Sequence, residues 1–89
     1  YNADKPVEAS GTIEQAVYDN PHGTVQLKTA GKTWQVVLAP PSRMESRGLA
    51  KSQLVAGQKA TVVGYPHRSN NDEMRAERIT IGGKTTELR

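Results

Sequence analysis

Two histidines and two methionines are the candidate metal-binding side chains of this sequence. His22 lies in the segment DNPHG and His67 in the segment PHRSNND, so both are expected in loops rich in turn-forming residues. An imidazole can change its charge near neutral pH and is a common metal ligand, and the thioethers of Met44 and Met74 suit Cu(I). The candidate metal-binding residues are therefore His22, His67, Met44 and Met74, and copper is the candidate metal.

The same residues also have simpler explanations, which the sequence leaves open. His22 could be an exposed turn residue or one bonded to nearby backbone, and each methionine could fill space at the end of a barrel. The two histidines are expected on loops that frame a binding face from separate sides. Zinc normally takes three or four ligands, so a single imidazole makes a weak site.

The segment DNPHG has the composition of a tight, preorganised turn. Asn20 precedes a proline and is pushed toward extended geometry. Pro21 presets φ for a turn, and Gly23 can take a positive φ. The side chain of Asp19 or Asn20 can accept hydrogen bonds from the following amides. None of these requirements needs a histidine at position 22.

Residues typical of catalytic sites have other roles in this pattern. Cysteine is absent, which excludes disulfides and thiolate metal sites. Glu73 and Glu77 fall on the solvent side of one strand, and Ser42 is explained as a helix cap. The segment GQKATVVG lacks the lysine–serine ending of a phosphate-binding loop. We therefore expect a protein that is not an enzyme.

Basic residues are scattered along the chain. Twelve lysines and arginines against nine acidic residues give a net charge of +3, and acidic neighbours interrupt them. The alternation predicts that Trp34 faces the core, which leaves no aromatic side chain there for stacking bases. The outward positions of the second and third strands are Thr24, Gln26, Lys28, Thr33, Gln35 and Val37. Nucleic acid is therefore not the expected partner.

Alternation of apolar and polar residues predicts strands over 7–17, 24–28, 33–38, 59–65 and 74–81. Gln15 breaks the apolar side of the first strand, formed by Val7, Ala9, Gly11, Ile13 and Val17, which predicts a bulge nearby. Tight hairpins are expected at 30–32 and at Gly82-Gly83, the latter leading to a short terminal strand.

A short helix is expected between the third and fourth strands. Ser42 and Glu45 fit a capping box at its start, and Gly48 suits the left-handed residue past its end. Leu49 and Leu54 are expected to plug the core. This order predicts an all-β, closed, OB-fold-like barrel of five to six strands, formed as a single domain over 1–89. An open sandwich and an SH3-like barrel are the alternatives.

The segments YNADKPVEASGTI, NPH, APPSRMESRGL, LxxGQKATVVGY and MRAERIT occur in this order over most of the chain. This set resembles a family of small exported bacterial domains of unknown function, with an OB-like fold and a periplasmic location. Many relatives have tryptophan just before the NPH motif, where this chain has Tyr18. The family usually carries a signal peptide and a short histidine-containing segment before the position that matches Tyr1. The resemblance therefore implies export and the OB-like fold. If the precursor carries the histidine-containing segment, its terminal amine and histidines could bind copper.

The expected function is a periplasmic binding or accessory module, with a metal ion or another periplasmic protein as partner. We expect a monomer, and no apolar run is long enough to span a membrane. One alternative is an OB-fold protein that binds single-stranded nucleic acid. Another is a protein–protein adaptor that uses Val37 and Tyr65 as apolar anchors.

Overall fold

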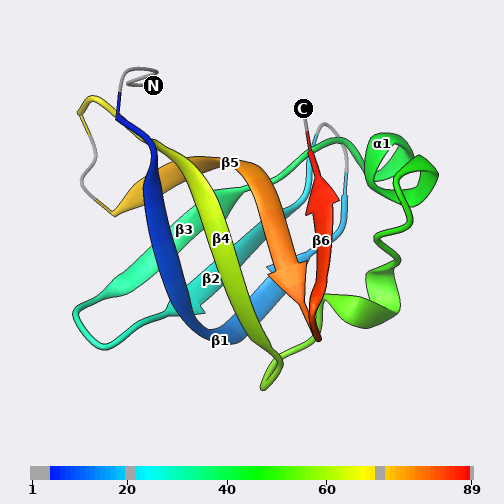
Figure 1. Ribbon diagram of the computed structural model, residues 1–89, viewed down its shortest axis with the longest axis horizontal. Coiled ribbons are helices and arrows are strands. Elements are labelled where there is room, and N and C mark those ends of the chain that lie inside the picture. Colours follow the sequence, from blue (N-terminus) through cyan, green and yellow to red (C-terminus); the bar gives the residue numbers. More distant parts are fainter. Residues whose placement is uncertain (1–4, 20–21, 70–71, 89) are drawn as a thin grey trace.

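The strands of the chain close into a barrel with a short helix at one end (Figure 1). The computed structural model describes residues 5–19, 22–69 and 72–88. Its elements are β1 (Val7–Val17), β2 (Thr24–Lys28), β3 (Thr33–Val37), α1 (Pro41–Ser46), the 3₁₀ turn η1 (Lys51–Gln53), β4 (Lys59–Pro66), β5 (Glu73–Ile81) and β6 (Lys84–Glu87).

The barrel closes because β1 pairs with two strands. Its first half pairs with β4 and its second half with β2, and Thr12 is paired with both. β3 then pairs with β2 on one side and, in parallel, with β5 on the other. The circuit β1-β2-β3-β5-β4 is therefore closed, and β6 extends it beyond β5. This arrangement confirms the predicted OB-fold-like barrel with a helix between the third and fourth strands.

A bulge in β1 changes which side chains face the core. The register with β2 shifts between Ile13 and Gln15, so Glu14 is an extra residue. Beyond it the alternation is inverted: Ala16 packs against the core, and Val17 is 41% exposed. The predicted bulge is confirmed, but the inward placement of Val17 was wrong, because one extra residue moves every following side chain to the other face.

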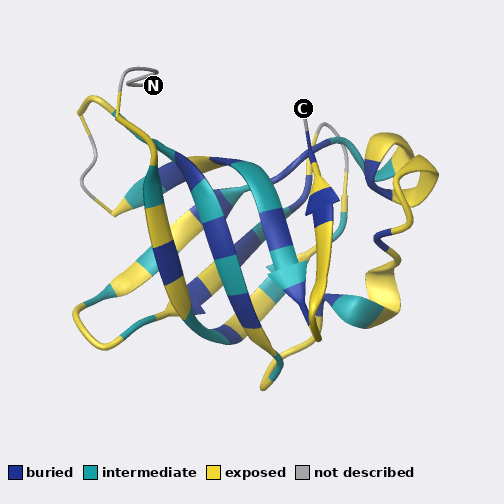
Figure 2. Ribbon diagram, in the orientation of Figure 1, coloured by how far each residue is buried: buried dark blue, intermediate teal, exposed yellow. Residues whose placement is uncertain are grey.

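The core is built from alternate residues of the strands, visible as bands of buried and exposed residues in Figure 2. Val25 and Leu27 of β2 and Val36 of β3 are almost fully buried, as are Val62 of β4 and Ile79 of β5. β4 lies between β1 and β5, as its apolar composition predicts. Burial of this kind stabilises a barrel by about 25 cal/mol for each Å² of apolar surface removed from water.

The helix α1 starts two residues earlier than the sequence predicts. Pro40 is its N-cap and Pro41 its first residue, and no side chain caps the helix. The capping box of Ser42 and Glu45 was therefore wrong. Proline is favoured at the first helical position, where its fixed φ fits and its missing N–H is not needed.

The end of α1 follows the prediction. Gly48 has a φ of +88°. Its backbone N–H donates to the Glu45 backbone carbonyl, and the N–H of Leu49 donates to the Met44 carbonyl at 2.8 Å. This is a Schellman motif, in which Met44 and Leu49 also pack together in the core. Leu54 is buried as well, so both predicted plugs reach the interior.

Candidate functional site

His22 lies at the base of the turn that leads into β2. The next residue, Gly23, is held against the segment after β3: its N–H donates to Ala39 at 3.0 Å, and its carbonyl accepts from Leu38 at 2.8 Å. Gly23 is buried but is not among the glycines with a positive φ, so that prediction was wrong. A Cβ on it would lie 2.8 Å from the Met44 methyl and 3.0 Å from the Val17 carbonyl. A side chain at this position would crowd the Val17 carbonyl and displace the Met44 methyl group.

The predicted turn geometry at Asn20 and Pro21 lies outside the described residues. His22 and Asp19 are both exposed. The backbone hydrogen bonds of Gly23 position the neighbouring His22. Its side chain is available to a ligand.

A cleft of about 250 Å³ opens beside His22. Three basic side chains line it, each from a different part of the fold: His22 from the turn before β2, Arg43 from α1 and Arg75 from β5. The rest of the lining consists of Val37, Leu38, Ala39, Pro40 and Leu88.

The two arginines of this cleft form no ion pair with another described residue. No acidic residue of the described ranges lines the cleft. Of the ion pairs among those residues, one joins Lys32 to Asp72 and two join Arg78 to Glu77 and Glu87, so none involves Arg43 or Arg75. The cleft is therefore a local concentration of positive charge that a ligand anion could offset.

Beside the cleft, paired residues of three neighbouring strands lie in a row on the outside of the barrel. Val37 of β3 is paired with Arg75 of β5, and Arg75 is paired with Tyr65 of β4. Their neighbours Val36, Leu38, Met74 and Ala76 are buried, so Val37, Arg75 and Tyr65 form one outward row. The outward position predicted for Val37 agrees with this row, in which Val37 and the other predicted anchor, Tyr65, are both partly buried.

His67 is fastened within its own loop. The imidazole Nδ1 accepts a hydrogen bond from the backbone N–H of Ser69 at 3.0 Å. The backbone N–H of His67 donates to the Glu73 carbonyl at 2.9 Å. His67 follows β4, whose end lies at the opposite end of the long axis from α1 and the start of β2 (Figure 1). The structure therefore separates His67 from His22.

The two methionines lie in the core. Met44 and Met74 each have no exposed surface; Met44 packs beneath Gly23, and Met74 is paired with Pro66, next to His67. Each histidine loop thus has one methionine beneath it, without access to solvent. In the described ranges, no three or more histidine and acidic side chains form a group that could hold a metal ion. The four predicted residues are not brought together.

Trp34 faces the core side of the barrel, as predicted. It pairs with the buried Leu27 and packs against the core while remaining partly exposed. The Lys32 ammonium lies 3.8 Å from the centroid of its ring and 4.0 Å from an Asp72 carboxylate oxygen. A cation on the ring face occupies the surface on which a base would stack.

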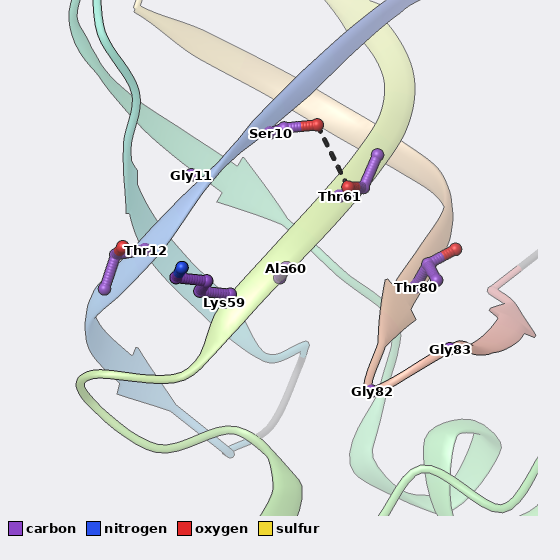
Figure 3. Close-up of a pocket in the computed structure, with 9 residues that line it drawn as sticks. All are labelled: Ser10, Gly11, Thr12, Lys59, Ala60, Thr61, Thr80, Gly82 and Gly83. Atoms are coloured by element: carbon purple, nitrogen blue, oxygen red, sulfur yellow. Dashed lines mark hydrogen bonds between the residues drawn. The ribbon is translucent and has the colours of Figure 1, made fainter.

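A second concave surface, of about 440 Å³, lies over β1, β4 and the β5–β6 hairpin (Figure 3). Its lining includes the hydroxyl groups of Ser10, Thr12, Thr61 and Thr80. The register aligns Ser10, Thr61 and Thr80 with Thr85 across four strands. Ser10 and Thr61 are hydrogen-bonded at 3.0 Å, and Thr80 and Thr85 at 2.7 Å. Such cross-strand pairs stabilise a sheet without any ligand, so this surface is a weaker candidate than the basic cleft.

Sequence reasoning identified His22 but missed Arg43 and Arg75. His22, Arg43 and Arg75 are far apart in the chain. The scattered distribution of basic residues did not indicate that any two of them would lie close together. The only local signal is the alternation in MRAER, which places Arg75 on the outside of β5. The parallel pairing of β3 with β5 and the position of α1 bring the residues together.

The described part of the chain contains no helix long and apolar enough to cross a membrane. No curated protein matches the chain significantly. A family model does match, over residues 1–76, and this range contains all three basic residues of the cleft. The chain belongs to the family of unknown function DUF6152.

Proposed function

We propose that this protein is an exported, non-catalytic binding module that holds an anionic group of its ligand in the cleft of His22, Arg43 and Arg75. The observation that carries the proposal is the meeting of three basic side chains from three elements around one cleft with no acidic lining residue in the described ranges. Guanidinium groups bind carboxylates and phosphates through paired, charge-assisted hydrogen bonds.

The scaffold supports binding because it fixes the positions of these residues. Arg75 belongs to a strand paired on both sides, and Gly23 ties the His22 turn to the segment before α1. Placement on paired strands reduces the freedom that is lost when a ligand binds. Catalysis has less support, since His22 is the only lining side chain in the described ranges that could act as a general base or nucleophile.

Export is supported by the resemblance of the sequence to small periplasmic domains. Fractionation of cells that produce the natural precursor tests it, and we expect the protein in the periplasmic fraction. Retention with a cytoplasmic marker would contradict this part of the proposal without affecting the cleft.

Anion binding is tested by NMR titration of the protein with acetate and with inorganic phosphate at low ionic strength. We expect the largest amide shifts at residues 22, 37–43 and 75. Arg75→Gln and Arg43→Gln should each weaken binding about tenfold, equivalent to about 1.4 kcal/mol.

A matched control separates the cleft from net charge. Arg68 is exposed in the β4–β5 loop, and Arg68→Gln removes the same charge outside the cleft. Equal losses in Arg68→Gln and Arg75→Gln, or shifts spread evenly over the surface, would overturn the proposal.

A further inference from the structure

We infer that the ligand is an organic carboxylate whose apolar body lies against Val37, rather than an inorganic anion or a phosphate-rich polymer. This inference rests on the proposed function of the cleft and names the chemistry of its ligand. Two features carry it: the apolar lining beside the basic groups and the pairing of Val37 with Arg75.

The lining combines charge with apolar surface. Five of its eight described residues are apolar or proline, and the other three are the basic residues. Leu38, Ala39 and Leu88 are almost fully buried, so the apolar surface within reach of a ligand is that of Val37 and Pro40. An inorganic anion would satisfy the guanidinium groups and leave the apolar part in contact with water. A ligand that carries both a negative charge and an apolar group would offset the charge and also remove apolar surface from water.

The register sets where the apolar group must lie. Val37 and Arg75 are directly paired across β3 and β5, and paired strands lie about 5 Å apart. A carboxylate bound by Arg75 therefore places the next atoms of its ligand within reach of the Val37 methyl groups. Tyr65, paired with Arg75 from β4, provides a second surface for a longer ligand.

The size of the cleft also limits the ligand. Its volume of about 250 Å³ lies below the roughly 300–1,000 Å³ of typical small-molecule pockets. It suits a carboxylate with one apolar group. A nucleic acid also needs successive bases stacked on exposed aromatic rings, whereas the row of Val37, Arg75 and Tyr65 offers one ring and the Lys32 ammonium lies over the Trp34 ring.

The test compares four small probes by NMR titration: 3-phenylpropanoate, the uncharged 3-phenylpropanamide, acetate and inorganic phosphate. We expect 3-phenylpropanoate to bind about tenfold more tightly than acetate, through its apolar group, and about tenfold more tightly than the amide, through its charge. Two dipeptide probes, acetyl-Gly-Phe and its C-terminal amide, identify the source. If acetyl-Gly-Phe binds more tightly than 3-phenylpropanoate, the carboxylate is the end of a peptide; the reverse order indicates a small acid.

Val37→Thr is the decisive variant, because it keeps the β-branched shape and replaces one methyl group by a hydroxyl. It should weaken 3-phenylpropanoate about threefold and leave acetate and phosphate unchanged. Val63→Thr is the control, at a partly buried position of β4 away from the cleft.

The outcomes separate this inference from the proposal beneath it. Equal affinity for acetate, phosphate and 3-phenylpropanoate, or equal effects of Val37→Thr and Val63→Thr, would overturn the inference and leave anion binding standing. Failure of every anion to bind would overturn both.

Discussion

The hydroxyl of Tyr18 donates a hydrogen bond to the backbone carbonyl of Leu49 at 2.8 Å. This bond joins the end of β1 to the segment that follows α1, across a long separation in the sequence. It therefore fixes the helix that carries Arg43 against the barrel. The position of one side of the basic cleft depends on this contact and on the burial of Met44 and Leu49.

Replacing Tyr18 by Phe should lower the free energy of unfolding by about 1 kcal/mol, because a partly buried hydrogen bond is lost. Burial, and secondarily the negative charge of Glu45, raise the pKa of Tyr18 above its usual value. The folded state thus favours the neutral phenol, and this contribution is present below about pH 10 and falls as the pH rises through the raised pKa. Urea denaturation between pH 7 and 11 should show the difference between wild type and Tyr18→Phe narrowing above pH 10. A difference that stays constant over this range would contradict the assignment.

Gly48→Ala should lower the free energy of unfolding by about 1–2 kcal/mol, because alanine is strained at a φ of +88°. Gly31 lies in the β2–β3 turn, outside the left-handed region, and the space that a Cβ would occupy there is open. Gly31→Ala is therefore the control and should change stability by only a few tenths of a kcal/mol. Similar losses in both variants, measured by chemical denaturation, would show that the Schellman motif has no special role.

Gly11→Ala should be among the most damaging small substitutions in the barrel. A Cβ at this position would collide with the Lys28 carbonyl oxygen, and it would lie 2.7 Å from the carbonyl carbon. Backbone atoms cannot move aside as a flexible side chain can, so we expect a loss of about 3 kcal/mol or more. Thermal unfolding measures it. A variant as stable as wild type would mean that β1 does not cross the end of β2 so closely.

Copper binding stays a prediction from the sequence, and the structure sharpens its test. Because His22 and His67 lie on loops at different ends of the barrel, the two imidazoles should respond to Cu(I), Cu(II) or Zn(II) independently in an NMR titration. His22→Gln should leave the response at His67 unchanged, and the converse should also hold. Loss of both responses in either single variant would indicate a shared site. If no resonance near either histidine or the true amino terminus of the full mature protein moves at stoichiometric metal, the metal hypothesis is wrong.

A single-stranded oligonucleotide should leave the fluorescence of Trp34 unchanged, since Lys32 covers the ring and the core holds it. The chain contains one tryptophan, so the signal has one source. Salt-sensitive quenching would support the nucleic-acid alternative instead.

The strands could be predicted from the sequence because their signals are local. Alternation over a few residues identifies a strand, and Gly82-Gly83 identifies a hairpin, where both glycines have a positive φ. The order of strands with one helix then leads to the barrel. None of these steps requires knowledge of a distant contact.

The errors arose where two local rules compete or where a register shifts. Pro41 and Ser42 both fit the start of a helix, and the structure uses the proline. The bulge was expected, but its effect on Val17 depends on which residue is extra, and that is decided by pairing with β2. A glycine at position 23 was expected because it can take a positive φ. The observed reason is the close approach of Met44 and the Val17 carbonyl to this position.

The basic cleft could not be predicted beyond His22. Arg43 and Arg75 each have an ordinary local setting, on a short helix and on the outer side of a strand. Only the parallel pairing of β3 with β5 and the packing of α1 over the barrel end bring them to the same cleft. Such contacts depend on how the whole chain closes.

The extra residue at Glu14 determines the orientation of the aromatic ring four positions later. With the bulge, Ala16 and Tyr18 pack against the core and Val17 lies outside. Deleting Glu14 would restore a uniform alternation, turn Val17 inward and point the phenol into solvent. The helix would then lose its hydrogen bond to the first strand, so a single inserted residue on one strand holds an arginine of the basic cleft, on another element, in place.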